Sequence, residues 1–556
     1  MNREKETSPY SRKLSVFFTD ATAVKAGCTG LRPGKPGDPL VTGLEYDSRK
    51  VKPGSLYFAL QGIHADGHSF IPQAVAQGAS VIVHEKELEE YKTRVTYIRV
   101  QDSRFAMSPI AAAFYDHPSR RMAVIGVTGT EGKSTTVYLI YQFLRLLGFK
   151  AGFISTVMYG DGKNEFQNSE HQTTPEAVTV HKLLADMKQN GADFAVLEAS
   201  SHGLSKRTNR LGDVSFDIGI MTNVTHEHLE FHGTWEQYRS DKAELFRSLE
   251  NEARTGGKTG LKAKGSILVP SFAAVNADDP SAAYFSEAAK CKTYTYSVRG
   301  APGDLSIRTI ESGAAGNRYE VYSPGVGENL VIQDRLPGAF NAGNVLASLL
   351  AVSNLLSRNI RDLAALVLYL KPVRGRMTAI SRGQPFEVLV DYAHTPSSFE
   401  TLFPPLRKRL DASGGRIISL FGSAGERDTK KRPEQGRIAA EWSDILILTD
   451  EDPRGEKPMA ILEEIAGGIK GRNREEDLFL IPDRPQAIKK AFALAKQGDL
   501  VLLLGKGHEN SIIYADKVMP YDEIRQAEQS LDELGYPQET KPCHGQSRDS
   551  AGSAAP

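Results

Sequence analysis

The stretch Ala123-Val-Ile-Gly-Val-Thr-Gly-Thr-Glu-Gly-Lys-Ser-Thr-Thr136 decides the fold at the centre of this chain. An apolar run ends in glycines, and Lys133 and Ser134 lead into residues 136–147, which have the apolar pattern of an amphipathic helix. Glycines let backbone N–H groups turn towards an anion, a lysine reaches the β- and γ-phosphates, and a serine hydroxyl binds Mg²⁺. A chance glycine-rich loop is the alternative, but the flanking strand and helix favour a phosphate loop that binds ATP. The residues predicted to form it are Thr128, Gly129, Thr130, Glu131, Gly132, Lys133, Ser134 and Thr135.

Composition excludes several classes of protein. The 556 residues suffice for three to four domains of ~150 residues each. Because 68 basic and 68 acidic side chains give a formal net charge of +0, we expect neither a nucleic-acid nor a membrane partner. The three cysteines include no C-x-x-C pair and no disulfide framework, which fits a reducing cytosol. A polar N-terminus and the lack of an apolar run of ~18 residues predict a soluble, cytoplasmic protein, which we expect to be a monomer.

Apolar runs and turn residues divide the chain into α/β domains. Short strands and an alanine-rich helix at 71–77 predict a small N-terminal domain, and alternating strands and helices predict a doubly wound, mostly parallel central sheet. After a helical run at 344–370, Lys371-Pro372 breaks the pattern and a Rossmann-like α/β unit follows. The predicted domains are 1–120, 121–370 and 371–537, with a surface insertion at 251–265 and a disordered tail at 538–556. The expected strands include 55–60, 79–84, 194–198, 218–222, 386–390, 416–421, 445–448 and 500–504.

Acidic side chains and histidines follow two of these strands, at the ends where α/β folds place their ligands. Glu198 precedes Ala-Ser-Ser-His-Gly203, so a carboxylate, two hydroxyls and an imidazole converge on one loop; a simple strand cap is the alternative. Residues 222–232 contain three histidines and two glutamates, which suit a metal site, a surface loop or capping chemistry. Composition assigns no role to Lys242, because any solvated helix lysine would have the same surroundings in sequence.

A series of motifs runs in order from about residue 40 to residue 530. They are Asp47-Ser-Arg49, 54–59, Asp66-Gly-His68, the phosphate loop, Thr173-Thr-Pro175, 198–204, 222–233, 276–279, 340–344, Gly375-Arg-Met377, 391–396, 422–433, Asp452-Pro-Arg454 and 505–509. Together they resemble the Mur ligases, ATP-dependent amide-forming enzymes of peptidoglycan synthesis, and most closely the UDP-N-acetylmuramoyl-tripeptide synthetases, the MurE type. The resemblance implies three domains, which bind in turn the UDP-sugar, ATP and an amino acid.

The resemblance also implies the chemistry. ATP would phosphorylate a carboxylate to an acyl phosphate, which an amine then attacks, while Lys133, Ser134 and Mg²⁺ spread the phosphate charge over fixed cations. A second Mg²⁺ would bind Glu198, His228 and a carbamylated Lys242, because an N6-carboxylysine offers oxygen ligands where an ammonium would repel the ion. The implied catalytic residues are Lys133, Glu198, His228 and Lys242, and the implied metal ligands are Ser134, Glu198, His228 and Lys242.

Further contacts are implied by matching motif positions. The residues that would bind the nucleotide-sugar peptide are Ser48, Arg49, Thr173, Thr174 and Ser200. Those that would contact the adenine, ribose and phosphates of ATP are Asn341, Asn344, Arg376 and Asp391. The chain departs from the family at Glu131, Gln172, Lys206 and Thr208. Arg207 or Arg210 would then replace the sugar contacts usual at the last two positions.

The segment Glu451-Asp-Pro-Arg454 concerns the incoming amino acid. Family members that add meso-diaminopimelate carry D-N-P-R, whose Asn and Arg hold the distal carboxylate, whereas many lysine-adding members lack the Arg. Arg427, Arg454, Gly505 and Glu509 match diaminopimelate contacts, but Asp452 replaces an amide donor with an anion that attracts an ammonium. Meso-diaminopimelate, L-ornithine and L-lysine therefore stay open as substrates.

The implied activity is that of an ATP-dependent, ADP-forming ligase that adds a diamino acid to the D-Glu of UDP-N-acetylmuramoyl-L-Ala-D-Glu. A kinase or simple NTPase is an alternative, but it has no need of the motifs at 391–396 and 505–509. A non-catalytic Mur-like binding protein is another, but it would be expected to have lost Lys133 or the metal ligands. Folylpolyglutamate synthetases share the fold and lack Asp47-Ser-Arg49.

Overall fold

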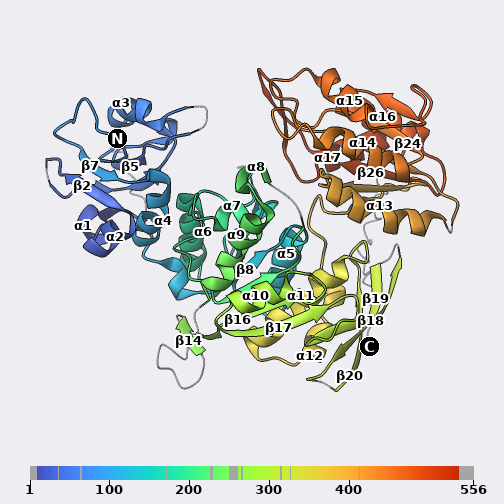
Figure 1. Cartoon of the computed structure of the whole chain (residues 1–556), viewed down its shortest axis with the longest axis horizontal. Helices are drawn as coiled ribbons and strands as arrows, with labels where there is room; N and C mark the ends of the chain where they lie inside the picture. Colours follow the sequence, from blue (N-terminus) through green and yellow to red (C-terminus); the bar gives the residue numbers. More distant parts are fainter. Residues whose placement is uncertain are drawn as a thin grey trace, which may run out of the picture. The chain divides into compact units, whose positions relative to one another are not determined.

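The computed structural model describes residues 9–35, 37–62, 65–168, 172–225, 229–249, 261–264, 267–313, 316–325, 327–411 and 413–536. The chain forms two compact units, Met1–Val373 and Arg374–Pro556 (Figure 1). Both are built from sheets covered by helices, so the α/β class predicted from the sequence is confirmed. The predicted limits of the individual domains stay predictions. Within the described ranges no helix is long and apolar enough to cross a membrane.

The first sheet of unit one is small and mostly parallel. Its strands, in spatial order, are β2 (Cys28–Arg32), β7 (Thr96–Val100), β6 (Val81–His84), β5 (Ser55–Phe58) and β4 (Gly43–Glu45). Only the edge strand β2 runs antiparallel to its neighbour. Helix α4 (Ser103–Phe114), capped by the Asp102 carboxylate, packs its apolar residues against one face, and α3 (Ile71–Ala76) packs against the other.

The second sheet of unit one has eleven strands and carries the phosphate loop. In spatial order these are β11 (Glu165–Gln167), β10 (Met158–Gly160), β9 (Ala151–Ile154), β12 (Phe194–Glu198), β8 (Ala123–Thr128), β13 (Ile218–Met221), β16 (Phe272–Asn276), β17 (Lys292–Ser297), β18 (Leu305–Gly313), β19 (Gly316–Ser323) and β20 (Glu328–Asp334). The strands from β9 to β18 are parallel, and antiparallel strands extend the sheet at both ends. The antiparallel strands β19 and β20 were not predicted from the sequence.

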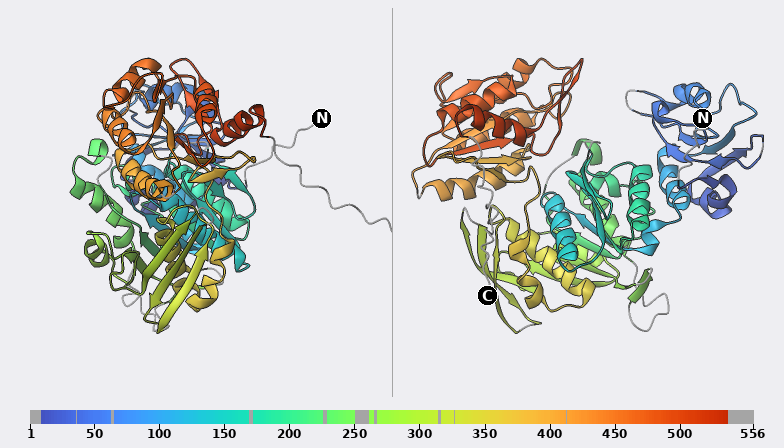
Figure 2. Two further views of the ribbon diagram at one scale, coloured as in Figure 1. Left: turned by 90° about the vertical axis from the view of Figure 1, so that its right-hand side faces the viewer. Right: turned by 180° about the vertical axis from the view of Figure 1, so that it is seen from behind.

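Helices cover both faces of this sheet (Figures 1 and 2). The helices on one face are α5 (Lys133–Leu146) and α11 (Asn341–Leu356), and those on the other are α6 (Ala177–Gln189), α9 (Trp235–Arg247) and α10 (Ala282–Ala288). Successive strand residues point to opposite faces. Ile125 therefore belongs to the core under α5 and α11, and Val124 to the core under α6, α9 and α10. All of β8 is buried, which explains its nearly continuous apolar sequence.

The prediction of one helical run at 344–370 is wrong. Helix α11 ends at Leu356, because Ser357 adopts a left-handed conformation with φ of 50°. A short helix, α12 (Ile360–Ala364), then begins under an Asn359 cap, and a 3₁₀ turn, η5 (Val367–Tyr369), follows. Two further predictions, the insertion at 251–265 and the tail at 538–556, fall largely or wholly outside the described residues.

Unit two is a six-stranded sheet between two helical layers (Figure 2). In spatial order its strands are β21 (Thr378–Ile380), β22 (Glu387–Asp391), β26 (Leu500–Leu504), β23 (Ile417–Phe421), β24 (Ile445–Leu448) and β25 (Leu478–Leu480). The helices on one face are α13 (Pro396–Asp411), α14 (Lys431–Trp442) and α15 (Pro458–Ala466), and those on the other are α16 (Arg484–Leu494) and α17 (Glu523–Glu533). All strands except β21 are parallel, so their carboxyl ends share one edge, where α/β sheets bind ligands.

Candidate active site

The phosphate loop has the strand–turn–helix form that the sequence predicted. It leaves β8 after Thr128 and enters α5 at Lys133. Gly132 has φ of +82°, and a Cβ atom there would lie 2.4 Å from Asn344 Oδ1. A Cβ atom at Gly129 would lie 1.9 Å from Thr222 Oγ1. Both positions therefore require glycine, because a larger residue would clash as well as strain the backbone.

The residues that follow β13 hold this loop in shape. Asn223 accepts hydrogen bonds from the Thr130 backbone N–H through its carbonyl, at 2.8 Å, and from the Glu131 N–H through Oδ1, at 2.8 Å. Thr222 Oγ1 donates to the Glu131 carbonyl at 2.6 Å. The loop is thus fixed by the protein itself, which suits the cradle of a phosphate group.

Two predicted catalytic groups meet at the start of α5. Ser134 Oγ donates to Glu198 Oε2 at 2.8 Å, and the Thr156 N–H donates to the same oxygen at 2.9 Å. Lys133 Nζ donates to the Thr130 carbonyl at 2.7 Å, which folds the side chain back over the loop. A hydroxyl and a carboxylate side by side are oxygen donors of the kind that Mg²⁺ prefers, so these residues fit the ion.

Lys242 lies in the same place and is not a solvated helix lysine. It is 2% exposed, and its Nζ donates to the Gly129 carbonyl at 2.6 Å and lies 4.4 Å from the centre of the Tyr238 ring. Tyr238 in turn shares a 3.1 Å hydrogen bond with Thr130 Oγ1. His228, the third predicted ligand, lies outside the described residues. The described residues include no cluster of three His, Cys, Asp or Glu side chains arranged as metal ligands.

Asn344, supported by Asn341, connects α11 to α5, the helix that follows the phosphate loop. Asn344 Nδ2 donates to Asn341 Oδ1 at 2.9 Å, and Asn344 Oδ1 accepts from Thr136 Oγ1 at 3.2 Å. Asn341 Nδ2 donates to the Pro337 carbonyl at 2.7 Å. Both amides are buried and hydrogen-bonded within the protein, so they hold α11 against the start of α5.

Two of the residues predicted to hold the muramoyl-dipeptide, Thr174 and Ser200, lie beside Glu198. Thr174 Oγ1 donates to the Glu198 carbonyl at 3.0 Å and bonds Ser200 Oγ at 2.9 Å, while Ser200 caps α7 (Ser201–Leu204). Arg210 donates to the Thr174 carbonyl at 2.8 Å. Thr173, next in the chain to Thr174, is half-buried. This group brings hydroxyls and one arginine beside the candidate catalytic carboxylate.

Ser48 and Arg49 belong to the small sheet and not to this group. Ser48 Oγ donates to Gln73 Oε1 at 3.0 Å. Arg49 is exposed and pairs with Asp47 through two hydrogen bonds of 2.9 and 2.8 Å. Arg207, one of the two proposed replacements for a sugar contact, bonds the Phe231 carbonyl at 2.7 Å.

In unit two, Asp391 lies at the carboxyl end of β22. Its two oxygens accept from the Met377 and Ala393 N–H groups at 2.7 and 2.8 Å. Burial raises the pKa of Asp391, and the nearby Arg376 opposes that rise. The Arg376 guanidinium lies 4.7 Å from the centre of the Tyr392 ring. Arg376 and Asp391, predicted together from two motifs, are therefore neighbours.

The acidic residue of the amino-acid motif has an internal partner. Lys506 Nζ, which is fully buried, donates to Asp452 Oδ1 at 2.9 Å and to Glu509 Oε2 at 2.5 Å. The Ile513 N–H also donates to Asp452 Oδ1, at 3.0 Å. The sequence predicts an anion at position 452 that attracts an ammonium, and in the structure the ammonium of Lys506 already pairs with it.

Two of the other predicted amino-acid contacts, Arg454 and Gly505, lie close to this pair. Arg454 adopts φ of +52°, and its N–H donates to the Ile513 carbonyl at 2.9 Å. Gly505 faces Glu451, whose Oε2 would lie 3.0 Å from a Cβ atom at position 505. Arg427 is exposed. The loops after β24 and β26 therefore meet at one edge of the sheet.

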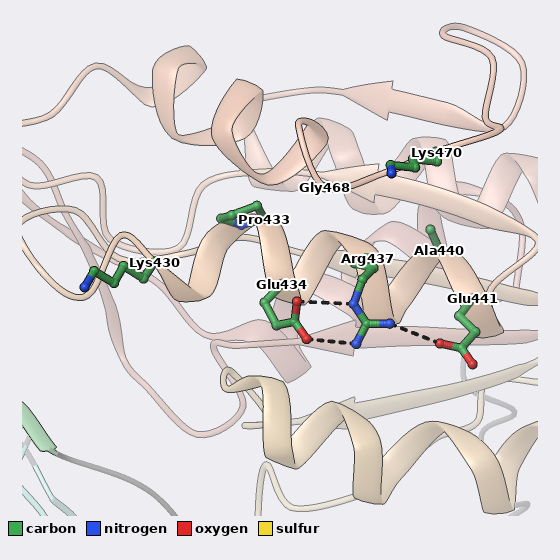
Figure 3. Close-up of a pocket in the computed structure, with 8 residues that line it drawn as sticks. All are labelled: Lys430, Pro433, Glu434, Arg437, Ala440, Glu441, Gly468 and Lys470. Atoms are coloured by element: carbon green, nitrogen blue, oxygen red, sulfur yellow. Dashed lines mark hydrogen bonds and ion pairs between the residues drawn. The ribbon is translucent and has the colours of Figure 1, made fainter. Parts of the chain in front are cut away.

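A surface pocket of about 460 Å³ lies elsewhere in unit two (Figure 3). Arg437, on α14, forms ion pairs with Glu434 and Glu441 along it, and Lys430 and Lys470 stand on its walls. None of the predicted site residues lines this pocket, so we assign it no part in the reaction.

Three family models match successive parts of the chain. They are the Mur ligase family catalytic domain at 40–115, the Mur ligase middle domain at 127–352 and the Mur ligase glutamate ligase domain at 375–507. A UDP-N-acetylmuramyl-tripeptide synthetase of Treponema denticola is 50% identical over 512 residues, which cover 88% of this chain and 94% of that protein. This chain belongs to the Mur ligase family. The resemblance inferred from the motifs, including the MurE type, is confirmed.

Other relatives agree with this placement. A UDP-N-acetylmuramoyl-L-alanyl-D-glutamate–2,6-diaminopimelate ligase of Clostridium tetani is 34% identical over 505 residues, 89% of this chain and 95% of that protein. A solved structure of such a ligase is 28% identical with a TM-score of 0.57, over 89% of this chain and 96% of that one. MurF from Acinetobacter baumannii, at 18% identity and a TM-score of 0.61, shares the fold. The chain therefore has the three-domain Mur ligase architecture and is an ATP-dependent, ADP-forming ligase.

Sequence reasoning missed several side chains that shape the site of this Mur ligase. The sequence shows Asn223 only as part of a histidine-rich segment, yet this residue fixes the phosphate loop. It places Lys506 in a motif and gives this lysine no role of its own. The only available signal for Lys506 was a lysine between glycines after a buried apolar strand, a position where a solvated lysine is unusual.

Proposed function

We propose that this Mur ligase joins the α-amine of a diamino acid to the D-Glu carboxylate of UDP-N-acetylmuramoyl-L-Ala-D-Glu, in cytoplasmic peptidoglycan precursor synthesis. One observation carries the proposal: Lys133, Ser134, Glu198 and Lys242 all contact one another or one short loop, at the carboxyl ends of β8 and β12. Such a cluster of cations and oxygen ligands is what transfer of a γ-phosphoryl group to a carboxylate requires.

The chain's own residues divide the work. When bound, ATP supplies the phosphoryl group that makes the carboxylate an acyl phosphate, and Mg²⁺ offsets the charge between the two anions. With ATP and Mg²⁺ bound, Lys133 would exchange the Thr130 carbonyl for phosphate oxygens, and Ser134 and Glu198 would hold the metal through their oxygens. Thr174 and Ser200 orient the acceptor beside Glu198, and Arg376 and Asp391 bind the nucleotide. These roles agree with the hydrogen bonds and burial described above.

For the substrates, Ser48 and Arg49 bind the UDP end. Arg427, Asp452, Arg454, Gly505 and Glu509 form the amino-acid pocket. Meso-diaminopimelate, ornithine and lysine remain candidates, because the pocket carries both carboxylates and cations. We further propose that the enzyme acts as a monomer, which its mass in solution by light scattering would check.

The deciding experiment supplies purified protein with UDP-N-acetylmuramoyl-L-Ala-D-Glu, ATP, Mg²⁺ and one diamino acid at a time. We expect ADP release only when both the muramoyl-dipeptide and a diamino acid are present, and a product heavier by one amide-linked residue in mass spectrometry. ATP hydrolysis that is independent of these substrates and yields no amide would refute the ligase function.

We also propose that Lys242 carries a carbamate. Carbamylation would replace the buried ammonium with a buried anion, which would bind Mg²⁺ together with Glu198 and His228. Lys242→Ala should lose about 10²-fold or more in kcat, and a short carboxylate such as acetate or propionate should restore part of it. A carbonyl signal from ¹³C-bicarbonate in the parent protein, absent from Lys242→Ala, would support the carbamate directly. Near-normal turnover of Lys242→Ala would exclude the metal-bridging role.

A further inference from the structure

Arg484 is the first residue of α16, and its side chain is fully buried. Its Nε and Nη2 atoms donate to the two carboxylate oxygens of Glu523 at 2.9 and 2.6 Å. The Tyr521 hydroxyl donates to Glu523 as well. The guanidinium is therefore held in one orientation by a bidentate partner that is itself fixed.

The remaining donors of Arg484 bind two backbone carbonyls. Nη1 donates to the Asp450 carbonyl at 3.0 Å, and Nη2 donates to the Leu504 carbonyl at 2.7 Å. Leu504 is the last residue of β26, and Asp450 follows closely after β24. These strands are not neighbours, because β23 lies between them. One side chain thus connects two strand ends across a third strand.

Both carbonyls stand where a proposed substrate loop begins. The residue after Asp450 opens the segment 451–454, and the residue after Leu504 opens the segment 505–509. The two segments meet again further out, through the Lys506–Asp452 ion pair. Arg484 therefore fixes the bases of the two loops whose tips are proposed to bind the amino acid.

Stability alone does not account for such a pair. Removing two charges from water costs about as much as their attraction returns, and apolar residues of similar size often replace a buried pair without loss. A lysine would also supply the charge, but only the planar arginine fork reaches a carboxylate and two carbonyls at once. What the pair uniquely provides is a fixed geometry at the carboxyl edge of the sheet.

We propose that Arg484, oriented by Glu523, is a positioning residue that sets the spacing of the two loops of the amino-acid pocket. The proposal rests on the function proposed above for those loops. It assigns Arg484 an effect on the diamino acid and none on ATP or the nucleotide-sugar peptide, although Arg484 touches no substrate.

The test compares Arg484→Lys with the parent enzyme and with a matched control, Arg416→Lys. Arg416 makes the corresponding contacts at the opposite, amino-terminal edge of the same sheet, where it bonds Asp499 at 2.6 Å and the Leu494 carbonyl at 2.9 Å. We expect Arg484→Lys to raise the KM for the diamino acid about tenfold, with the KM for ATP changed by less than about twofold. Arg416→Lys should change neither.

A second variant and a second measurement protect the test against misfolding and against failure of the proposed function. Arg484→Met with Glu523→Leu keeps an apolar core while removing both carbonyl contacts. In either Arg484 variant, amide hydrogen exchange should quicken about tenfold at 449–455 and 504–513, while β22 keeps the parent rate. Exchange no different from that of Arg416→Lys, or equal rises in all KM values, would overturn the proposal. If the parent forms no amide, the proposed function fails, and exchange alone then decides the role of Arg484.

Discussion

The phosphate loop of unit one and the substrate edge of unit two are stabilised in different ways. The loop is one continuous segment whose shape depends on glycine conformations and on hydrogen bonds to the residues after β13. The edge joins segments that are distant in sequence through buried charges, such as Lys506 and Asp452, 54 residues apart. The shape of the phosphate loop should therefore be most sensitive to added atoms, and the shape of the substrate edge to changed charges. Four experiments test that difference.

The largest effect is expected at the phosphate loop. Lys133 bonds the Thr130 carbonyl and is expected to move from it to the phosphates when ATP binds. Lys133→Ala removes this cation, so kcat/KM should fall about 10³-fold or more. ADP release in the complete assay measures it, and Lys163→Ala, an exposed lysine, is the control. Retention of a tenth of the parent rate by Lys133→Ala would show that the phosphate charge is met elsewhere.

A smaller effect is expected at the substrate edge. Asp452→Asn leaves Glu509 as the carboxylate that bonds the Lys506 ammonium, and it removes one negative charge from the pocket. The ratio of kcat/KM values should move about tenfold towards meso-diaminopimelate and away from ornithine or lysine. Competition between two amino acids, read by mass spectrometry, measures the ratio directly. Asp444→Asn, at the amino-terminal edge, serves as control, and an unmoved ratio in Asp452→Asn would remove residue 452 from specificity.

Two glycines, Gly132 in the loop and Gly148 just after the end of α5, separate backbone strain from steric clash. Gly148 has φ of +84° with no atom within 4 Å of an added Cβ, whereas Gly132 has φ of +82° and meets Asn344 at 2.4 Å. Gly148→Ala should cost about 1 kcal/mol of unfolding free energy and Gly132→Ala about 3 kcal/mol. In a Trp442→Phe background, Trp235 reports urea unfolding of unit one alone. An equal loss of unfolding free energy in the two variants would mean that Asn344 moves aside without cost.

The smallest effect concerns Asp450, whose carbonyl binds Arg484. Burial raises the pKa of the Asp450 carboxyl to about 6, against 3.8 ordinarily. The folded state therefore binds the proton more tightly, so this contribution to stability is full below pH 3.8 and is lost as pH rises to about 6. Asp450→Asn should raise the unfolding free energy by about 1 kcal/mol at pH 8 and by nothing at pH 3.5. Trp442 fluorescence in a Trp235→Phe background measures it, and the same gain at both pH values would exclude titration as the cause.

The fold was largely predictable, because buried parallel strands are continuous apolar runs. Residues 194–198, 445–448 and 500–504 form β12, β24 and β26 over the predicted ranges. The break in the helical run at Ser357 was not predictable, because a left-handed serine leaves no pattern in the sequence. The strands β19 and β20 were not predicted, because they extend the sheet as antiparallel strands and are not part of the alternation of helices and strands on which the prediction was based.

The site was predictable where the chemistry is local or matches a motif, and not where it depends on partners distant in sequence. The strand–turn–helix form of the phosphate loop followed from its motif. The partner of Asp452 did not, because nothing in a sequence states which cation a buried carboxylate will meet. For the same reason the Arg484–Glu523 pair was invisible before the structure.

The two anionic partners of Lys506 also affect how the sequence of this enzyme can evolve. A buried cation with a single anionic partner would be left without a counter-charge if that partner were lost. Lys506, in contrast, keeps its ion pair with Glu509 when residue 452 becomes neutral. Aspartate and asparagine codons differ by a single nucleotide. A lineage could therefore drift between amino-acid preferences by one base change, through an intermediate that still folds, while the phosphate loop admits no comparable step.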